Sequence, residues 1–235
     1  MKSSPETPLS NALMSSALAH DIKNQLQAWI GQSEQVLAEV SAADRPKVQA
    51  LITQTQRIHQ TTLQWMALSQ LDQVGRYPSD DAWPIATINA VREASTTAYP
   101  DVEWQLEVDE LSQGYYHEGL VQMALSNLCN NAMQLGASRL TIQVEETADG
   151  ALLWQCLDNG PGFPQTILAA YSCESTSLAG ASDEGAAIRA LSEREGGSGF
   201  GLVFVRAVLA HHGCADSLQL SNHDDGARVV WRLPG

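Results

Sequence analysis

The chain has 235 residues, 44% of them hydrophobic, which is enough for one complete core and a second smaller one, and so for one or two domains. Its net charge of −14 is concentrated after residue 72, where eight basic side chains stand against 21 acidic ones and none is lysine. This distribution argues against nucleic acid or an anionic membrane surface as a partner. With no signal-like N-terminus and no apolar run of about 20 residues, the chain is expected to be cytoplasmic without membrane insertion.

The first predicted element is a long helix, because apolar residues recur at helical spacing from Leu9 to Val40. Residues 41–46 then predict a turn, since Asp44 can cap a helix and Pro46 suits a first helical position. A second helix with an apolar stripe continues towards Leu71. One hairpin cannot bury both stripes, so residues 9–72 are expected to form a four-helix bundle in a homodimer.

Residues 73–84 contain a glycine, two prolines and two adjacent aspartates, which predicts a linker between domains. Beyond it, residues 85–235 combine two patterns. Alternating apolar residues predict strands near 102–108, 139–145, 151–158, 217–222 and 227–234, and helical periodicity predicts helices near 85–99, 120–135 and 202–212. The expected fold class is therefore α + α/β, a helical hairpin followed by an α/β sandwich. The aperiodic segment 163–196 is typical of a lid or of disorder.

Three short motifs follow one another in the second domain: NLCNNA at 127–132, DNGPG at 158–162 and GSGFGL at 197–202. Each alone is weak, because polar helix faces, aspartate–glycine turns and glycine-rich caps are all common. Together they supply different parts of what ATP requires. An amide oxygen of Asn131 could hold Mg²⁺ without adding charge. The carboxylate of Asp158 could accept a hydrogen bond from the adenine amino group, while Gly160 and Gly162 allow close backbone approach.

The third motif places Gly197, Gly199 and Gly201 before a helix that begins near Leu202. Free backbone N–H groups and the helix dipole favour phosphate at such a position. ATP with Mg²⁺ is therefore the ligand that the three motifs predict in combination.

These motifs resemble the N box and the two glycine boxes of the GHKL ATPase superfamily, and within it the catalytic domain of histidine kinases. The spacings, 27 residues from Asn131 to Asp158 and 39 from Asp158 to Gly197, are similar to the family's. The resemblance covers about residues 85–235 and implies a GHKL-type ATP-binding sandwich. In the hydrolases and serine kinases of the superfamily, a glutamate stands four residues before the Mg²⁺ asparagine. This chain has Asn127 there, and because an amide is no useful general base, transfer to another nucleophile is expected.

The candidate nucleophile is His20, in the first helix, followed by Asp21 and, one turn later, Asn24. A solvent-facing imidazole is mostly neutral at neutral pH, and Asp21 could fix its tautomer. The pattern resembles the H box of histidine kinases. The chain is therefore expected to be a kinase core that lacks an attached sensor domain. It implies autophosphorylation on His20, transfer to the receiver domain of a response regulator, and regulator dephosphorylation assisted by Asn24. A separate sensor protein is a further possible partner.

Other interpretations remain open. The chain could be a histidine phosphotransfer relay whose GHKL domain serves for docking, or a GHKL ATPase with an incidental hairpin, which Asn127 disfavours. Many family members have a lysine three residues after the Mg²⁺ asparagine, where this chain has Gln134. Arg189 and Arg194 in the lid could compensate or could simply be solvated.

Overall fold

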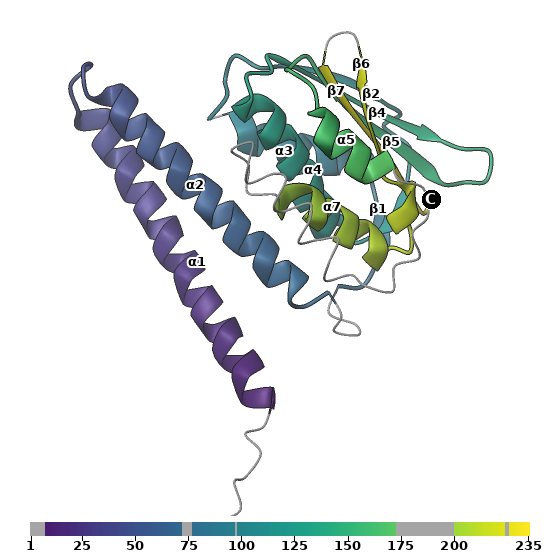
Figure 1. Cartoon of the computed structure of the whole chain (residues 1–235), viewed down its shortest axis with the longest axis horizontal. Helices are drawn as coiled ribbons and strands as arrows, with labels where there is room; N and C mark the ends of the chain where they lie inside the picture. Colours follow the sequence, from purple (N-terminus) through teal and green to yellow (C-terminus); the bar gives the residue numbers. More distant parts are fainter. Residues whose placement is uncertain (1–7, 72–76, 97, 173–199, 224–225) are drawn as a thin grey trace, which may run out of the picture. The chain divides into compact units, whose positions relative to one another are not determined.

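The computed structural model describes residues 8–71, 77–96, 98–172, 200–223 and 226–235. The chain divides into two compact units, Met1–Gln70 and Leu71–Gly235. In the first unit, helices α1 (Pro8–Glu39) and α2 (Arg45–Leu68) pack against each other as a hairpin (Figure 1). The predicted pair of helices is thereby confirmed.

The turn between the two helices differs from its predicted chemistry in one respect. Asp44 is the residue before α2, but its side chain makes no capping hydrogen bond. Its carboxylate instead accepts hydrogen bonds from the Ser41 hydroxyl at 3.0 Å and from the Lys47 ammonium at 3.2 Å. Asp44 therefore stabilises the turn through side-chain contacts, because its helical backbone angles place it outside the usual extended capping geometry.

Each helix of the hairpin exposes large apolar side chains at intervals of seven residues. On α1 these are Ile22, Trp29 and Val36, and on α2 they are Leu51, Ile58 and Trp65. Seven residues complete almost two helical turns, so each set of three lies along one face of its helix. The exposed fraction reaches 64% for Trp29 and 63% for Leu51. Packing within the hairpin thus leaves an apolar stripe exposed on each helix.

The second unit is built on a mixed five-stranded sheet in the order β2-β4-β5-β7-β6. The strands are β2 (Glu103–Val108), β4 (Arg139–Glu146), β5 (Leu152–Asp158), β6 (Gln219–His223) and β7 (Gly226–Leu233). Only the β2–β4 pair is parallel within this sheet. Helices α3 (Pro84–Thr96), α4 (Glu118–Gln134) and α7 (Phe200–His211) lie on one side of it (Figure 1). The predicted strands and helices of the sandwich are confirmed, which confirms the fold class.

Burial alternates along the central strands, as expected for a sheet with one face against helices. Trp154 of β5 is fully buried and stacks on Trp231 of β7, with ring centroids 5.7 Å apart. Tyr116 meets Trp154 edge to face. The Tyr116 hydroxyl lies 3.2 Å from that of Thr87 on α3, and burial raises the pKa of Tyr116 to about 12. These aromatic side chains form the centre of the core.

Four of the described elements were not predicted, and one of them is the short 3-10 helix η1 (Ala215–Ser217). Helix α5 (Gln165–Ser172) lies at the start of the stretch expected to be a lid, and strands β1 (Asp80–Ala82) and β3 (Gly114–Tyr116) pair antiparallel. Strand β1 lies inside the stretch 73–84 suggested as a linker. The rest of the lid, from residue 173 to 199, falls outside the described residues.

Histidines of the second unit contact Tyr77, which lies in the stretch 73–84 suggested as a linker. The Tyr77 carbonyl contacts Nε2 of His211 at 2.8 Å, and the Tyr77 ring meets the rings of His117 and His211 edge to face. Next to them, His212 Nε2 accepts the backbone N–H of His117. Residues from Tyr77 onward are therefore integrated into the second unit rather than forming a free connection.

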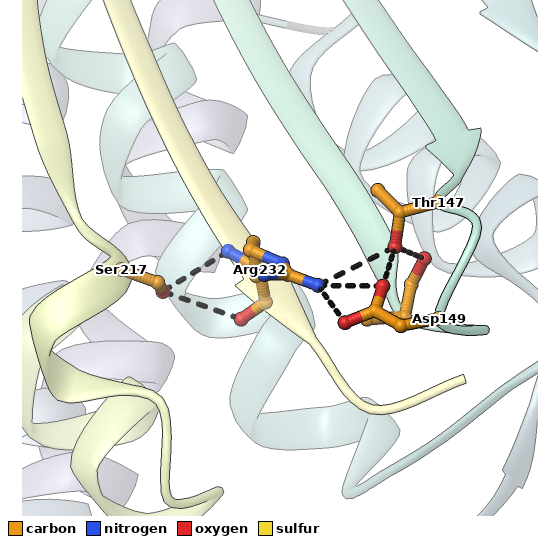
Figure 2. A network of polar contacts seen from close by, with 5 residues as sticks. Thr147, Asp149, Ser217 and Arg232 are labelled. Carbon is orange, nitrogen blue, oxygen red and sulfur yellow. Dashed lines mark hydrogen bonds and ion pairs between the residues drawn. The ribbon is translucent and has the colours of Figure 1, made fainter.

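A polar network ties the end of the sheet together (Figure 2). The Arg232 guanidinium on β7 donates to both carboxylate oxygens of Asp149, in the turn between β4 and β5, at 2.7 and 2.8 Å. The Thr147 hydroxyl also donates to Asp149. Hydrogen bonds from Thr147 and Arg232 lower the pKa of Asp149 to about 2. On the other side of Arg232, its backbone N–H donates to the Ser217 hydroxyl at 3.0 Å.

Candidate nucleotide-binding site

Helix α4 carries the asparagines of the first motif. It begins at Glu118, where His117 acts as the capping residue and its Nδ1 accepts the N–H of Leu120 at 3.1 Å. Apolar residues then bury one side of the helix against the core. Asn127 lies on this buried side, whereas Asn131, one turn later, is exposed. The two amides therefore share a helix face but differ in their access to solvent.

The second motif begins at the last residue of β5. Asp158 Oδ1 accepts the N–H of Gly160 at 2.8 Å and, more weakly, the N–H of Ala227 on β7 at 3.4 Å. The next residue, Asn159, accepts the N–H groups of Ser138 and Arg139 at the start of β4. The loop is therefore anchored to both neighbouring strands, and the Asp158 carboxylate is held in one orientation.

Two glycines of this loop have no room for a side chain. Gly162 has a left-handed φ of 77°, and a Cβ there would lie 2.9 Å from the Asn222 side chain. A Cβ at Gly160 would lie 2.9 Å from Asp158 Oδ1. Glycine is thus favoured at Gly160 by the contact with Asp158, and at Gly162 by the left-handed backbone and the contact with Asn222.

The third motif contacts the first. Gly201, in the first turn of α7, is buried, and a Cβ there would lie 2.5 Å from Asn127 Nδ2 and 3.0 Å from Asn131 Nδ2. The N-terminal turn of α7 therefore packs directly on the asparagine face of α4. The backbone N–H groups of that turn and the exposed amide of Asn131 are therefore brought into one region.

The first and second motifs are also joined, through two buried cysteines. Cys129 lies two residues before Asn131, and Cys156 lies two residues before Asp158. A hydrogen bond with Cys156, together with burial, raises the pKa of the Cys129 thiol well above its ordinary value. Both thiols are free rather than disulfide-bonded. Helix α4 packs against β5, and Asp158 also contributes to the raised pKa of Cys129, so the first two motifs lie near each other.

Comparison with known proteins agrees with this arrangement. The family described as histidine kinase-, DNA gyrase B- and HSP90-like ATPase matches residues 116–235, which is just over half of the chain and contains all three motifs. The chain belongs to this ATPase family. The predicted resemblance to GHKL proteins is therefore confirmed.

Solved structures extend the likeness to both units of the chain. AdeS, a histidine kinase of Acinetobacter baumannii, is 14% identical, with a TM-score of 0.55 over 90% of this chain and 95% of that one. Full-length ShkA in complex with AMPPNP is 16% identical, with a TM-score of 0.58 over 94% of this chain and 45% of that one. The mycobacterial sensor histidine kinase MprB is 21% identical, with a TM-score of 0.50 over 67% of this chain and 97% of that one. The fold is that of a GHKL histidine kinase core.

The other predicted site residues of the chain lie in several places. Leu202 follows Gly201 on α7 and is half-buried, whereas Gly197, Gly199, Arg189 and Arg194 lie outside the described residues. His20, Asp21 and Asn24 lie on α1 in the other unit, and the side chains of Asp21 and Asn24 are exposed. No helix in the described ranges is both long and apolar enough to cross a membrane.

Sequence reasoning missed the residues that hold the loop from outside. Asn222 contacts it from β6, and a Cβ at Gly226 on β7 would collide with the carbonyl oxygen of Asp158. Neither residue belongs to a motif, and both lie more than 50 residues after the loop. Only the register of the sheet, in which Asn222 pairs with Ala227, brings them there.

Proposed function

We propose that this chain is a histidine kinase that autophosphorylates His20 with ATP and then transfers the phosphate to an aspartate of a response regulator receiver domain. The observation that carries the proposal is the packing of Gly201 on Asn127 and Asn131. It joins a helix N-terminal turn to an exposed amide, which suits a phosphate chain with a divalent cation. Family membership and the fold shared with histidine kinases support the same conclusion.

Asp158 is the proposed adenine-recognising residue. Both of its backbone hydrogen bonds fall on Oδ1, so Oδ2 is proposed to accept the hydrogen bond from the adenine amino group. The absence of side chains at Gly160 and Gly162 allows the base to approach the backbone closely. AMPPNP in the ShkA complex supports a nucleotide as the ligand of this fold.

Asn131 and the start of α7 are the proposed partners of the phosphates. The exposed Asn131 amide oxygen would hold Mg²⁺, and the backbone N–H groups from Gly197 through Gly199 and Gly201 to Leu202 would donate to phosphate oxygens. A bound Mg²⁺ would supply neutralisation of the phosphate charge. The contact between Gly201 and Asn131 fits this role, because Gly201 has space only for a hydrogen atom beside the Asn131 side chain and so brings the backbone of α7 close to it.

Transfer to a histidine rather than to water is proposed because the residue four positions before the proposed Mg²⁺ ligand, Asn127, cannot act as a base. Asn127 is buried beneath Gly201, and an amide does not take up a proton at neutral pH. His20 needs no such base, since the neutral imidazole attacks with its own lone pair. Asp21 is proposed to fix the ring tautomer, and Asn24 to position water during dephosphorylation of the regulator.

A homodimer is the proposed assembly. The heptad-spaced exposed residues of α1 and α2, among them Trp29 and Leu51, form apolar stripes that a second hairpin would cover. Burial of such stripes is the main stabilising contribution in four-helix bundles. This supports dimerisation through residues 9–72.

The nucleotide part of the proposal is tested by calorimetric ATP titration in the presence of Mg²⁺. We expect Asp158→Ala to lose most ATP affinity, and Asn131→Ala to lose its Mg²⁺-dependent part. Asp101→Ala, which removes an exposed carboxylate elsewhere in the same unit, is the matched control and should bind as the wild type does. Unchanged affinity in Asp158→Ala would show that the site is misplaced. Absence of ATP binding by the wild type would favour the phosphotransfer relay.

A further inference from the structure

Asn222, near the end of β6, makes a paired contact with the loop of the second motif. Its Oδ1 accepts the N–H of Phe163 at 2.7 Å, and its Nδ2 donates to the carbonyl of the same residue at 2.9 Å. The side chain also lies against Gly162, whose left-handed backbone leaves no room for a Cβ. A single amide therefore pairs with both the N–H and the carbonyl of the last loop residue, as the backbone of a neighbouring strand would.

The sheet register connects this contact to the other end of the loop. Asn222 of β6 is paired with Ala227 of β7, and the Ala227 N–H lies 3.4 Å from Asp158 Oδ1. Gly226, beside Ala227, packs against the carbonyl of Asp158. One pair of antiparallel strands thus contacts the loop at Asp158, where it begins, and at Phe163, where it ends.

We propose that Asn222 is a positioning residue for nucleotide binding: it holds the 158–163 loop in its binding conformation before ATP arrives. This rests on the proposed ATP-binding function. A loop that is ordered in advance loses less conformational entropy on binding, so ligand affinity increases. A primary amide is needed because it offers an acceptor and a donor side by side. Aspartate would offer only acceptors, and one of them would face the Phe163 carbonyl oxygen.

The test compares Asn222→Ala and Asn222→Asp with Gln219→Ala, an exposed polar residue on the same strand that serves as the matched control. ATP affinity is measured by calorimetry, and phosphorylation kinetics with labelled ATP give KM and kcat separately. Loss of both hydrogen bonds should weaken ATP binding about tenfold. KM for ATP should rise to a similar extent, while kcat at saturating ATP stays near the wild-type value. Asn222→Asp should bind no better than Asn222→Ala, and Gln219→Ala should match the wild type.

Hydrogen exchange supplies a readout that does not depend on nucleotide. The Phe163 amide should exchange slowly in the free wild-type protein and in Gln219→Ala, but rapidly in both Asn222 variants. Wild-type ATP affinity in Asn222→Ala would overturn the inference and leave the proposed function standing. No ATP binding by the wild type would instead contradict the proposed function, and the positioning role would fall with it. A loss in kcat without a change in KM would also overturn the inference, because it would indicate a role in the transfer step.

Discussion

The contact between Gly201 and the asparagines of α4 predicts a large functional effect from one methyl group. In Gly201→Ala, the new Cβ would lie 2.5 Å from Asn127 Nδ2 and 3.0 Å from both Asn127 Oδ1 and Asn131 Nδ2. Ordinary contact between such atoms is about 3.5 Å, so the Asn127 amide must move by about 1 Å. Because Asn127 is buried, it cannot simply swing into solvent. The displacement therefore passes to Asn131 or to the start of α7.

The expected magnitudes separate stability from function. Overpacking costs about 1–3 kcal/mol, and alanine is favoured over glycine within a helix by about 1 kcal/mol, so the free energy of unfolding should fall by about 0–2 kcal/mol. A displacement of about 1 Å at a positioning residue can reduce activity about a hundredfold. We therefore expect ATP affinity or labelling rate to fall by roughly 10- to 100-fold in a protein that still folds.

Urea unfolding and ATP calorimetry on the same preparation measure both quantities. Gly31→Ala is the matched control, because Gly31 also lies in a helix and a Cβ there would meet nothing within 4 Å. Gly31→Ala should gain up to about 1 kcal/mol in stability and leave ATP affinity unchanged. If Gly201→Ala bound ATP as tightly as the wild type and was labelled at the same rate, the contact of Gly201 with the two asparagines would not matter for the function of the site.

Two further predictions concern pH and assembly. Burial lowers the pKa of His117 below its ordinary value of 6.5. Below about pH 6.5 this histidine therefore binds more protons in the unfolded chain than in the folded one, so the free energy of unfolding falls as pH decreases. His117→Asn keeps an acceptor for the helix cap but cannot titrate. Urea unfolding at about pH 7.5 and about pH 5.5 should therefore show a smaller decrease in the free energy of unfolding for this variant than for the wild type. An equal decrease in the two proteins would contradict the role of His117. Sedimentation should give a dimer for the wild type and for Trp83→Glu, whose exposed tryptophan lies in the second unit, but a monomer for Trp29→Glu. A monomeric wild type at micromolar concentration would refute the dimer.

Local sequence patterns predicted the main elements because each carries a periodic signal. The five strands of the large sheet alternate, the long helices show apolar stripes, and glycine and proline separate them. Strands β1 and β3 have three residues each, too few for alternation to be seen. Asp44 shows a similar limit: its residue type favours a cap, but the turn geometry determines which hydrogen bonds it makes.

Only those residues of the candidate site that belong to the three sequence motifs could be predicted. Asp158, Asn131 and Gly201 stand in motifs whose chemistry suggests a nucleotide. Asn222 could not be found in this way, because its hydrogen bonds join residues 59 positions apart and depend on the register between β6 and β7. The tertiary fold alone brings such residues together, so a single sequence contains no local signal for them.

Autophosphorylation of His20 is the central claim, and labelling with γ-³²P ATP and Mg²⁺ tests it most directly. The wild type should acquire a phosphate that is labile in acid and stable in base. His20→Gln should acquire none while it binds ATP as tightly as the wild type does, because His20 lies on α1 and the nucleotide motifs lie in the second unit. Full labelling of His20→Gln, or an acid-stable phosphate in the wild type, would contradict the histidine kinase assignment.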